Sequence, residues 1–386
     1  MAYGVQMNDD MLTRLKAIDV GILTDVVRKV QRSSSFEITD WSVQPLSNKG
    51  IANPDGLWLF SGQGYDSNAV RPWSVVVKIF IQPEQEPPLD NLYHWKRELL
   101  LAQSGLLEHL PGPVRAPLFY RTDEYPDSAW IWMEQIADRQ SGPWALEQYA
   151  FAARQLGQWN GACLAMIAPL EEPWLARRHY IPWLTWMNVE KDWQFPLNQI
   201  HISVELRRRY EQLWAERERF YRVLESLPQV FSHFDSQRRN LFICQGKDKQ
   251  DQLVLVDWAQ CGLGPIGAEL NWLVGMSAGL LEWSPSSLPE LDTVTFESYL
   301  QGMYESGWSG ERDIVRLGYA AWLAVFMGCI FPGYTASWCS AENRLDALQI
   351  FGMAEEELFW QVLPLLNYSL DCADEARQLM NKIGIP

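Results

Sequence analysis

The sequence predicts an α+β fold, with strands gathered in the first third of the chain and helices dominating the rest. Two runs rich in β-branched and aromatic residues, 73–80 and 129–136, predict strands. Apolar residues recur at helical spacing over residues 144–168, and further helical composition follows residue 288. With 386 residues, of which 47% are hydrophobic, the chain is long enough for two lobes that each bury a core.

The N-terminal region predicts a helix followed by further strands. Apolar residues recur on one face of residues 9–31, so a helix is expected there. The short apolar runs 41–43 and 57–60 are candidate strands. Gly62 and Gly64 are expected in the turn that follows the second run, in a structural role.

A short segment of the chain contains the residues that a phosphoryl-transfer enzyme needs. His233, Asp235 and Asn240 occur in that order, and Asp257 follows them. A phosphoryl donor requires a divalent cation, and Mg²⁺ prefers oxygen ligands such as those of Asn240 and Asp257. Asp235 can accept the proton of an attacking hydroxyl group. The alternative is a surface loop with scattered carboxylates, but the ordered set favours a phosphate and metal site.

The residues between Asn240 and Asp257 predict a β-hairpin. Two apolar runs, 241–244 and 253–256, flank a polar, glycine-containing stretch over residues 245–252. Because the two strands of a hairpin end at the same place, we expect Asn240 and Asp257 to lie close together.

These residues resemble the catalytic and metal loops of the aminoglycoside phosphotransferase and choline kinase family. Asp257 with the tryptophan after it, and the run 264–270, resemble that family's Asp-Trp-Glu, Gly-x-Pro and Asp-Leu motifs. Two residues depart from the family pattern. Ala259 stands where an acidic residue is common, and Glu269 stands where Asp is usual. Glu269 should still provide a carboxylate that steadies the catalytic loop, on a longer side chain.

The resemblance implies the small-molecule branch of the protein-kinase-like fold, with two lobes. The N-terminal lobe, residues 1–137, would be a small, mostly antiparallel sheet with a helix and would bind the nucleotide. The C-terminal lobe, residues 138–386, would be larger, mainly helical, and would hold the catalytic and acceptor-binding groups.

In such proteins a strand lysine contacts the donor phosphates and is held by a helix glutamate. Lys78 lies in the predicted strand 73–80, where a lone lysine is costly unless it is paired. Glu98 lies in a segment of helical composition, residues 90–105, and fits the partner by type, spacing and order. The alternative is that Lys78 lies on an edge strand and Glu98 is solvated. The motif of Asp235, Asn240 and Asp257 further along the chain favours the pair over this alternative.

By the same resemblance, residues 129–136 form the last strand of the small lobe and the hinge. Backbone groups from Glu134 to Ile136 would hydrogen-bond adenine, with Met133 beside the ring. An ordinary buried strand is the competing interpretation. No Gly-x-Gly-x-x-Gly motif covers the phosphates, and the small-molecule branch often lacks one.

The implied reaction is transfer of the γ-phosphoryl of ATP, or GTP, with Mg²⁺ as the metal, to a hydroxyl of a small molecule. Protein kinases carry a lysine two residues after the catalytic aspartate, whereas this chain has Gln237. The stretch between Asp257 and Glu269 is also too short for a platform that docks a protein substrate. Our hypothesis is that Arg238 or Arg239 replaces the missing cation; the alternative is a pair of surface arginines.

Two rival functions remain. A nucleotide-binding pseudokinase or interaction module would keep the fold without transfer, yet binding alone does not require the base Asp235. A two-domain hydrolase would use the carboxylates on water, but it leaves Lys78 and Glu98 unexplained.

Composition narrows the set of partners. A formal net charge of −16 argues against nucleic acid and is compatible with a cationic acceptor such as an aminoglycoside. Interrupted apolar runs and the lack of a signal pattern indicate a cytoplasmic protein without a membrane partner. The six cysteines show no metal spacing and suit a reducing compartment. The acceptor, an antibiotic, an amino alcohol or a sugar, stays open, as do the oligomeric state and the role of the Trp-rich residues 173–195.

Overall fold

The structure is a computed structural model that covers most of the chain in eight stretches. The described residues are 10–46, 56–67, 69–140, 142–164, 171–178, 202–246, 249–330 and 351–385. Within them we find no helix with the length and hydropathy that a membrane span requires.

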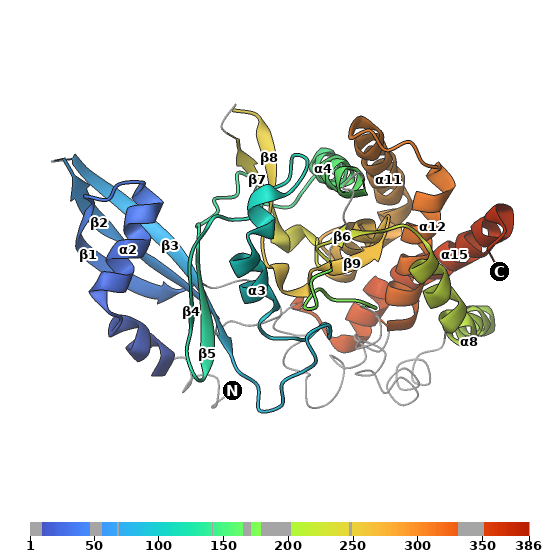
Figure 1. The fold of residues 1–386 in the computed structure, drawn as a ribbon. Helices are drawn as coiled ribbons and strands as arrows, with labels where there is room; N and C mark the ends of the chain where they lie inside the picture. Colours follow the sequence, from blue (N-terminus) through green and yellow to red (C-terminus); the bar gives the residue numbers. More distant parts are fainter. Residues whose placement is uncertain are drawn as a thin grey trace. The chain divides into compact units, whose positions relative to one another are not determined.

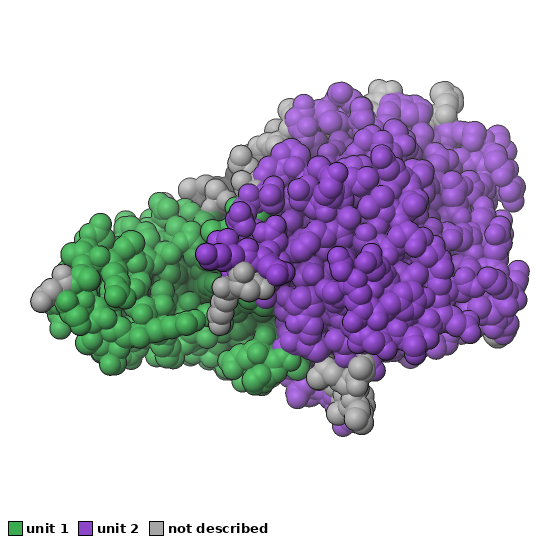
Figure 2. All heavy atoms as spheres, turned by 90° about the horizontal axis from the view of Figure 1, so that it is seen from above, with its two compact units in different colours: residues 1–87, 95–109, 115–138 green, residues 88–94, 110–114, 139–386 purple. Residues whose placement is uncertain are grey.

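The chain divides into two compact units (Figure 2). Unit 1 consists of residues 1–87, 95–109 and 115–138, and unit 2 of residues 88–94, 110–114 and 139–386.

Unit 1 contains a five-stranded antiparallel sheet in the order β1-β2-β3-β5-β4 (Figure 1). Its strands are β1 Glu37–Pro45, β2 Leu57–Asp66, β3 Ala69–Ile81, β4 Phe119–Glu124 and β5 Ser128–Met133. The strands predicted around residues 41–43, 57–60, 73–80 and 129–136 are therefore confirmed, except that β5 ends at Met133.

The prediction that Gly62 and Gly64 form a turn is wrong. Both lie inside β2 and are paired with β3. Glycine is needed there because β1 approaches closely: a Cβ on Gly62 would lie 2.1 Å from the carbonyl oxygen of Asp40. A Cβ on Gly64 would lie 2.4 Å from that of Glu37. The two glycines therefore mark a close approach of two backbones and not a chain reversal.

Helices cover the two faces of this sheet. The predicted helix over residues 9–31 is split into a helix at residues 10–16 and α2 Val20–Gln31, because Asp19 caps α2 by accepting the Gly21 N–H at 2.7 Å. α2 packs on one face, over a core that includes Val75, Val77 and Trp132. α3 Arg97–Ser104 packs on the other face against Val76, Ile131 and Met133. It is shorter than the helix predicted over residues 90–105, and the 3₁₀ turn η1 Leu106–His109 follows it.

Unit 2 is mainly helical, as predicted. α4 Leu146–Leu164 packs along α11 Leu288–Glu305. The other long helices are α8 Val204–Ser226, α12 Arg312–Leu323 and α15 Glu355–Ile383. Two π-helical stretches, η4 Asn271–Met276 and η6 Ala324–Ile330, contact each other through Trp272 and Phe326, whose ring centroids are 4.6 Å apart.

Two small antiparallel sheets lie among these helices. β6 Gln229–Ser232 pairs with β9 Gly262–Pro265, and β7 Leu241–Gln245 pairs with β8 Asp251–Leu255. The predicted hairpin is therefore confirmed. Short helical turns lie between the strands, η2 Arg238–Asn240 and η3 Trp258–Gln260, and between β9 and α11, α9 Ala268–Leu270, α10 Ser277–Gly279 and η5 Pro285–Ser287.

Candidate active site

The β7–β8 hairpin brings two of the predicted site residues to one end. Leu241 is paired with Leu255, and beyond this pair the Val256 N–H donates to the main-chain oxygen of Asn240 at 3.0 Å. Asp257 is the next residue. The hairpin register therefore aligns the predicted ligands Asn240 and Asp257, as the sequence indicated.

The side chains of Asp235 and Asn240 are directly hydrogen-bonded. The Asn240 amide Nδ2 donates to Asp235 Oδ2 at 2.7 Å and to the Asp235 main-chain oxygen at 2.9 Å. Gln237 Nε2 donates to the other carboxylate oxygen, Oδ1, at 2.8 Å. Asp235 is 8% exposed and Asn240 6%. Two amides thus fix the direction of a nearly buried carboxylate that still reaches solvent.

His233 links the loop to the end of β8. The Asp235 N–H can only donate, so His233 Nδ1, 3.2 Å away, accepts from it. The proton of the neutral ring is then on Nε2, which donates to the main-chain oxygen of Val256 at 3.0 Å. The ring also packs edge-on against Trp258, with centroids 4.6 Å apart. His233 therefore has a structural role, as its position before the loop suggested.

Two residues of this region adopt the left-handed conformation that disfavours residues other than glycine. They are Phe234, with φ of 57°, and Asp257, with φ of 64°. Such strain persists only where the surroundings enforce it, and it is typical of functional sites. For Phe234 the enforcement is packing: a Cβ on Gly264 would lie 2.3 Å from its ring, and Trp322 stacks on the ring at 5.7 Å.

The Glu269 side chain is hydrogen-bonded to the same loop. This fully buried carboxylate accepts the His233 N–H at 2.6 Å and the Ser236 hydroxyl hydrogen. Burial raises the pKa of Glu269 to about 7, although the hydrogen bonds of the loop act in the opposite direction. The sequence analysis expected a carboxylate at this place; the part played by Ser236 was missed.

A second buried set of hydrogen bonds supports the loop from a greater distance. The Tyr299 hydroxyl donates to Asn160 Oδ1 at 2.5 Å and accepts the Gly267 N–H at 3.3 Å. Asn160 Nδ2 donates to the main-chain oxygen of Phe231 in β6 at 3.4 Å. Sequence reasoning missed this link; its one signal was a polar Asn160 on an apolar helix face.

Both arginines that follow Gln237 have partners. Arg238 donates to the main-chain oxygens of Gln140 and Gly142 at 2.5 and 3.1 Å, and its guanidinium lies 4.2 Å from the centre of the Trp144 ring. Arg239 donates to Glu282 at 2.7 Å. The hypothesis that one of them replaces the kinase lysine stays a prediction, and these contacts weigh against it.

In unit 1, the predicted pair is formed. Lys78 Nζ lies 2.6 Å from Glu98 Oε2, with side chains 13% and 2% exposed. Lys78 is on β3 and Glu98 in the first turn of α3. The ion pair is therefore almost fully removed from water, which such a pair tolerates only with close geometry.

The predicted hinge residues follow β5. Met133 is paired with Val76, so it lies on the sheet face that also carries Lys78, two residues along β3. The Glu134 carboxylate is bound by Arg115 at 2.6 and 3.1 Å, and the Glu134 N–H donates to Leu118 at 2.8 Å. Its N–H is thus not available to a base, and Ile136 is half-buried. Adenine recognition by this segment stays a prediction.

The Trp-rich segment 173–195 is described only as far as residue 178. There Trp174 is buried, and Arg178 pairs with Glu225 at 3.0 Å. The remainder of the segment lies outside the described residues.

Comparison with known proteins decides the family. The sequence profile of the phosphotransferase enzyme family (APH) matches residues 68–312, well over half of the chain. The chain belongs to this family. Among curated protein sequences, none matches significantly.

Solved structures of similar fold include kinases of small molecules. A microcompartment-associated aminopropanol kinase is 11% identical with a TM-score of 0.53, covering 93% of this chain and 98% of its own. Wild-type aminoglycoside 2′-phosphotransferase-IIIa in its GDP complex is 12% identical with a TM-score of 0.49, over 91% and 98% of the two chains. At identities this low, structural similarity supports only a shared fold. We infer that fold from the similarity to the aminopropanol kinase.

Two predictions made from the sequence are thereby confirmed. The fold is the α+β, protein-kinase-like fold of the phosphotransferase enzyme family, and the chain is a phosphotransferase by family.

The chemistry of the available donors fits the Mg²⁺ ion that such a reaction implies. Asn240 turns its Nδ2 toward Asp235, which directs its amide oxygen elsewhere, and Asp257 adds a carboxylate. Mg²⁺ keeps several waters and takes few protein oxygens. Accordingly, it does not require a cluster of three or more His, Cys, Asp or Glu side chains, and none occurs within the residues that the structure describes.

Proposed function

We propose that this phosphotransferase moves the γ-phosphoryl group of ATP, or GTP, to a hydroxyl group of a small molecule. The observation that supports this most is the environment of Asp235. Its carboxylate is nearly buried, held by Asn240, and placed in a strained loop beside the hairpin end that carries Asp257.

Asp235 is the base in this proposal. Its carboxylate orients the acceptor hydroxyl and accepts its proton as the oxygen attacks the phosphorus. Gln237 and Asn240 donate to different oxygens of Asp235, so the carboxylate cannot rotate freely. Preorganisation of this kind lowers the cost of reaching the transition state.

Asn240 and Asp257 are the proposed ligands of Mg²⁺. When bound, the ion neutralises charge on the donor phosphates and aligns them. The left-handed backbone of Asp257 and the hydrogen bond from Asn240 to Asp235 set the directions of the two ligating side chains.

Lys78 is the proposed contact to the α- and β-phosphates of the donor. Glu98 keeps its ammonium group in place at 2.6 Å. Met133 lies on the same sheet face and would contact the base, with the main-chain oxygen of Glu134 and main-chain groups of Ile136 as hydrogen-bonding partners.

The acceptor is proposed to be an aminoglycoside-like antibiotic, an amino alcohol or a sugar. An aminopropanol kinase has a similar fold, and an amino alcohol acceptor is consistent with that range. A net charge of −16 favours cationic members of it. The proposed use of a nucleoside triphosphate is the reason that we also propose a cytoplasmic location.

The test is an acceptor screen followed by mass spectrometry. Wild-type protein with Mg²⁺ and ATP or GTP is incubated with a panel of aminoglycosides, amino alcohols and sugars, and a phosphoryl mass gain is sought. Asp235→Asn keeps the shape of the side chain and removes the base, so turnover should fall on the order of 10²–10⁴-fold. Equal turnover in this variant would reject Asp235 as the base.

The alternative is a pseudokinase or interaction module that binds nucleotide without transfer. Thermal stabilisation by ATP and Mg²⁺, without mass gain on any acceptor, would favour it. Asp235→Asn separates the two functions further, because a binding module should keep its stabilisation by nucleotide and have no turnover to lose.

A further inference from the structure

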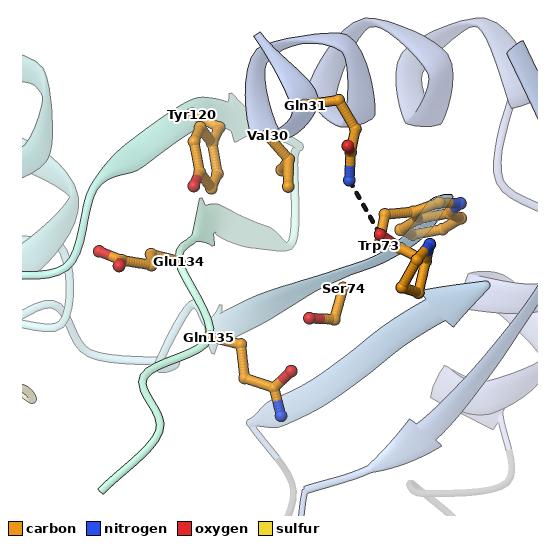
Figure 3. Close-up of a pocket in the computed structure, with 8 residues that line it drawn as sticks. Val30, Gln31, Trp73, Ser74, Tyr120, Glu134 and Gln135 are labelled. Carbon is orange, nitrogen blue, oxygen red and sulfur yellow. Dashed lines mark hydrogen bonds between the residues drawn. The ribbon is translucent and has the colours of Figure 1, made fainter. Parts of the chain in front are cut away.

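Unit 1 contains a cavity of about 420 Å³, and apart from the segment at Glu134 its lining has no role in the proposed reaction (Figure 3). It lies where the end of α2, the start of β3, the strand β4 and the segment after β5 meet. Its lining residues are Val30, Gln31, Pro72, Trp73, Ser74, Tyr120, Glu134 and Gln135. The volume falls in the range of small-molecule sites, roughly 300–1,000 Å³.

The cavity adjoins the segment proposed to bind the base, through Glu134 and Gln135, but the rest of its lining differs from the predicted donor site around Lys78. Val30, Trp73 and Tyr120 belong to the core on the α2 side of the sheet. Lys78 projects from the other side, with its neighbour Val76 packed under α3. Val30 and Gln31 also precede residue 68, at which the family profile begins. The cavity is therefore built partly by a segment outside the match to the family.

Strands β3 and β5 separate beside the cavity. β3 and β5 are paired up to Val76 and Met133, so Ser74 would face Gln135 next, but the ladder ends first. The Ile79 N–H donates to the main-chain oxygen of Gly56, just before β2, so the main-chain groups of Ile79 point toward β2. Along a strand, successive residues direct their main-chain groups to opposite neighbouring strands. The main-chain N–H and C=O of Ser74 therefore point toward the β5 side, into the split.

Among the described residues, the polar groups where β3 and β5 separate lack hydrogen-bonding partners. Within the described part of the chain, the main-chain N–H and C=O of Ser74, its hydroxyl and the side-chain amide of Gln135 have no hydrogen-bonding partner. The main-chain oxygen of Pro72, two residues earlier, also points toward the β5 side, and it accepts a hydrogen bond from Gln31 Nε2 at 3.0 Å. Figure 3 shows the Gln135 side chain and the Ser74 hydroxyl near the same opening.

The charge of the lining is balanced. Glu134 is the one charged residue among the lining residues, and Arg115 binds both of its carboxylate oxygens. In Figure 3 the Glu134 carboxylate points away from Ser74. The rings of Trp73 and Tyr120 add flat apolar surface. Such a lining suits an uncharged planar molecule and gives an anion no counter-charge.

We propose that this cavity is a second binding site, for an uncharged planar heterocycle that carries an N–H next to a carbonyl group. The heterocycle's carbonyl accepts from the Ser74 N–H, and its N–H donates to the Ser74 carbonyl, which restores the pair of hydrogen bonds that β5 does not make. Gln135 supplies a further amide at the rim, and Trp73 and Tyr120 contact the ring faces.

Oxindole, a fused lactam, is the probe, and N-methyloxindole is its matched control. Binding to the full chain is measured by ligand-observed NMR titration without nucleotide, so the result is independent of phosphoryl transfer. Oxindole should bind in the millimolar range or tighter. N-methylation removes the donor, and affinity should fall about tenfold or more. Equal affinity for both probes would overturn the proposal.

Two variants and a competitor locate the site. Val30→Trp fills the cavity and should weaken oxindole about tenfold or more, whereas Val20→Trp, on the exposed side of the same helix, should leave it unchanged. Saturating ATP with Mg²⁺ should not displace oxindole. Retained binding in Val30→Trp, or displacement by ATP, would show that the probe binds elsewhere. The probe comparison on the wild-type chain stands even if Val30→Trp does not fold.

Discussion

The two groups of proposed functional residues are held in place by different means. In unit 1, Lys78 lies in a regular ladder opposite Ile131, and an ion pair with Glu98 holds its side chain. In unit 2, Asp235 follows the left-handed residue Phe234 and depends on the buried carboxylate of Glu269. Regular secondary structure positions the first group; packing and buried hydrogen bonds position the second. We therefore expect distant substitutions to disturb the second group more.

After the loss of the base Asp235, removing Lys78 should give the largest effect. Lys78→Met deletes the proposed phosphate contact and removes the ammonium group from its ion pair with Glu98, which is 2% exposed. Turnover should fall roughly 10²–10³-fold, the range for losing one charge-stabilising contact. Steady-state kinetics on the acceptor found in the screen measure it.

Lys96→Met is the control for this change. Lys96 pairs with Glu124 in the same unit, but both side chains are partly exposed, at 29% and 47%. Turnover should remain close to wild type. Similar losses in both variants would mean that charge in general, and not the Lys78 contact, sets the rate.

Glu269 should make stability depend on pH. Because burial raises its pKa from 4.5 to about 7, the folded protein holds the Glu269 proton more tightly than the unfolded chain does. Its contribution is present below the unfolded pKa and is lost as the pH rises through about 7. The difference in free energy of unfolding between wild type and Glu269→Gln should therefore change by about 3 kcal/mol across that window. Urea unfolding of both proteins at about pH 5 and about pH 8 measures this, and a difference that is constant with pH would contradict it.

Gly264→Ala tests whether packing enforces the strained loop. The new Cβ would lie 2.3 Å from the Phe234 ring, so the ring must move, and with it the residue before Asp235. Stability should fall by about 1–3 kcal/mol, as for overpacked cores, and turnover should fall with it. Gly142→Ala is the control, since a Cβ there meets nothing within 4 Å. Normal turnover in Gly264→Ala would show that the Phe234 packing does not position Asp235.

The smallest effect is expected at the buried Tyr299 hydroxyl. Tyr299→Phe leaves the Gly267 N–H and Asn160 Oδ1 without a partner, which should cost about 1–2 kcal/mol of unfolding free energy. Tyr319→Phe is the control, because the Tyr319 hydroxyl has no hydrogen-bonding partner among the described residues. Denaturant titration compares them; equal costs would mean that the Tyr299 bonds add no net stability.

The sequence predicted most of the fold because its signals were local. Strand composition located β3 around Lys78, and two apolar runs with a polar turn located the β7–β8 hairpin. Errors arose where tertiary contacts overrode local pattern. Asp19 divides a continuous amphipathic pattern into two helices, and Gly62 and Gly64 serve a close approach of β1 and not a turn.

By itself, the sequence determined the identity and order of Lys78, Glu98, Asp235, Asn240 and Asp257, because residue type and spacing follow from chemistry that each motif must perform. Only the tertiary structure decided what supports them. Asn160 and Tyr299 come from distant parts of the chain, and their hydrogen bonds, like that of Ser236 to Glu269, form only in a shared interior from which water is excluded. The cavity beside Ser74 has the same origin, since it exists where a ladder ends and α2 packs over the gap.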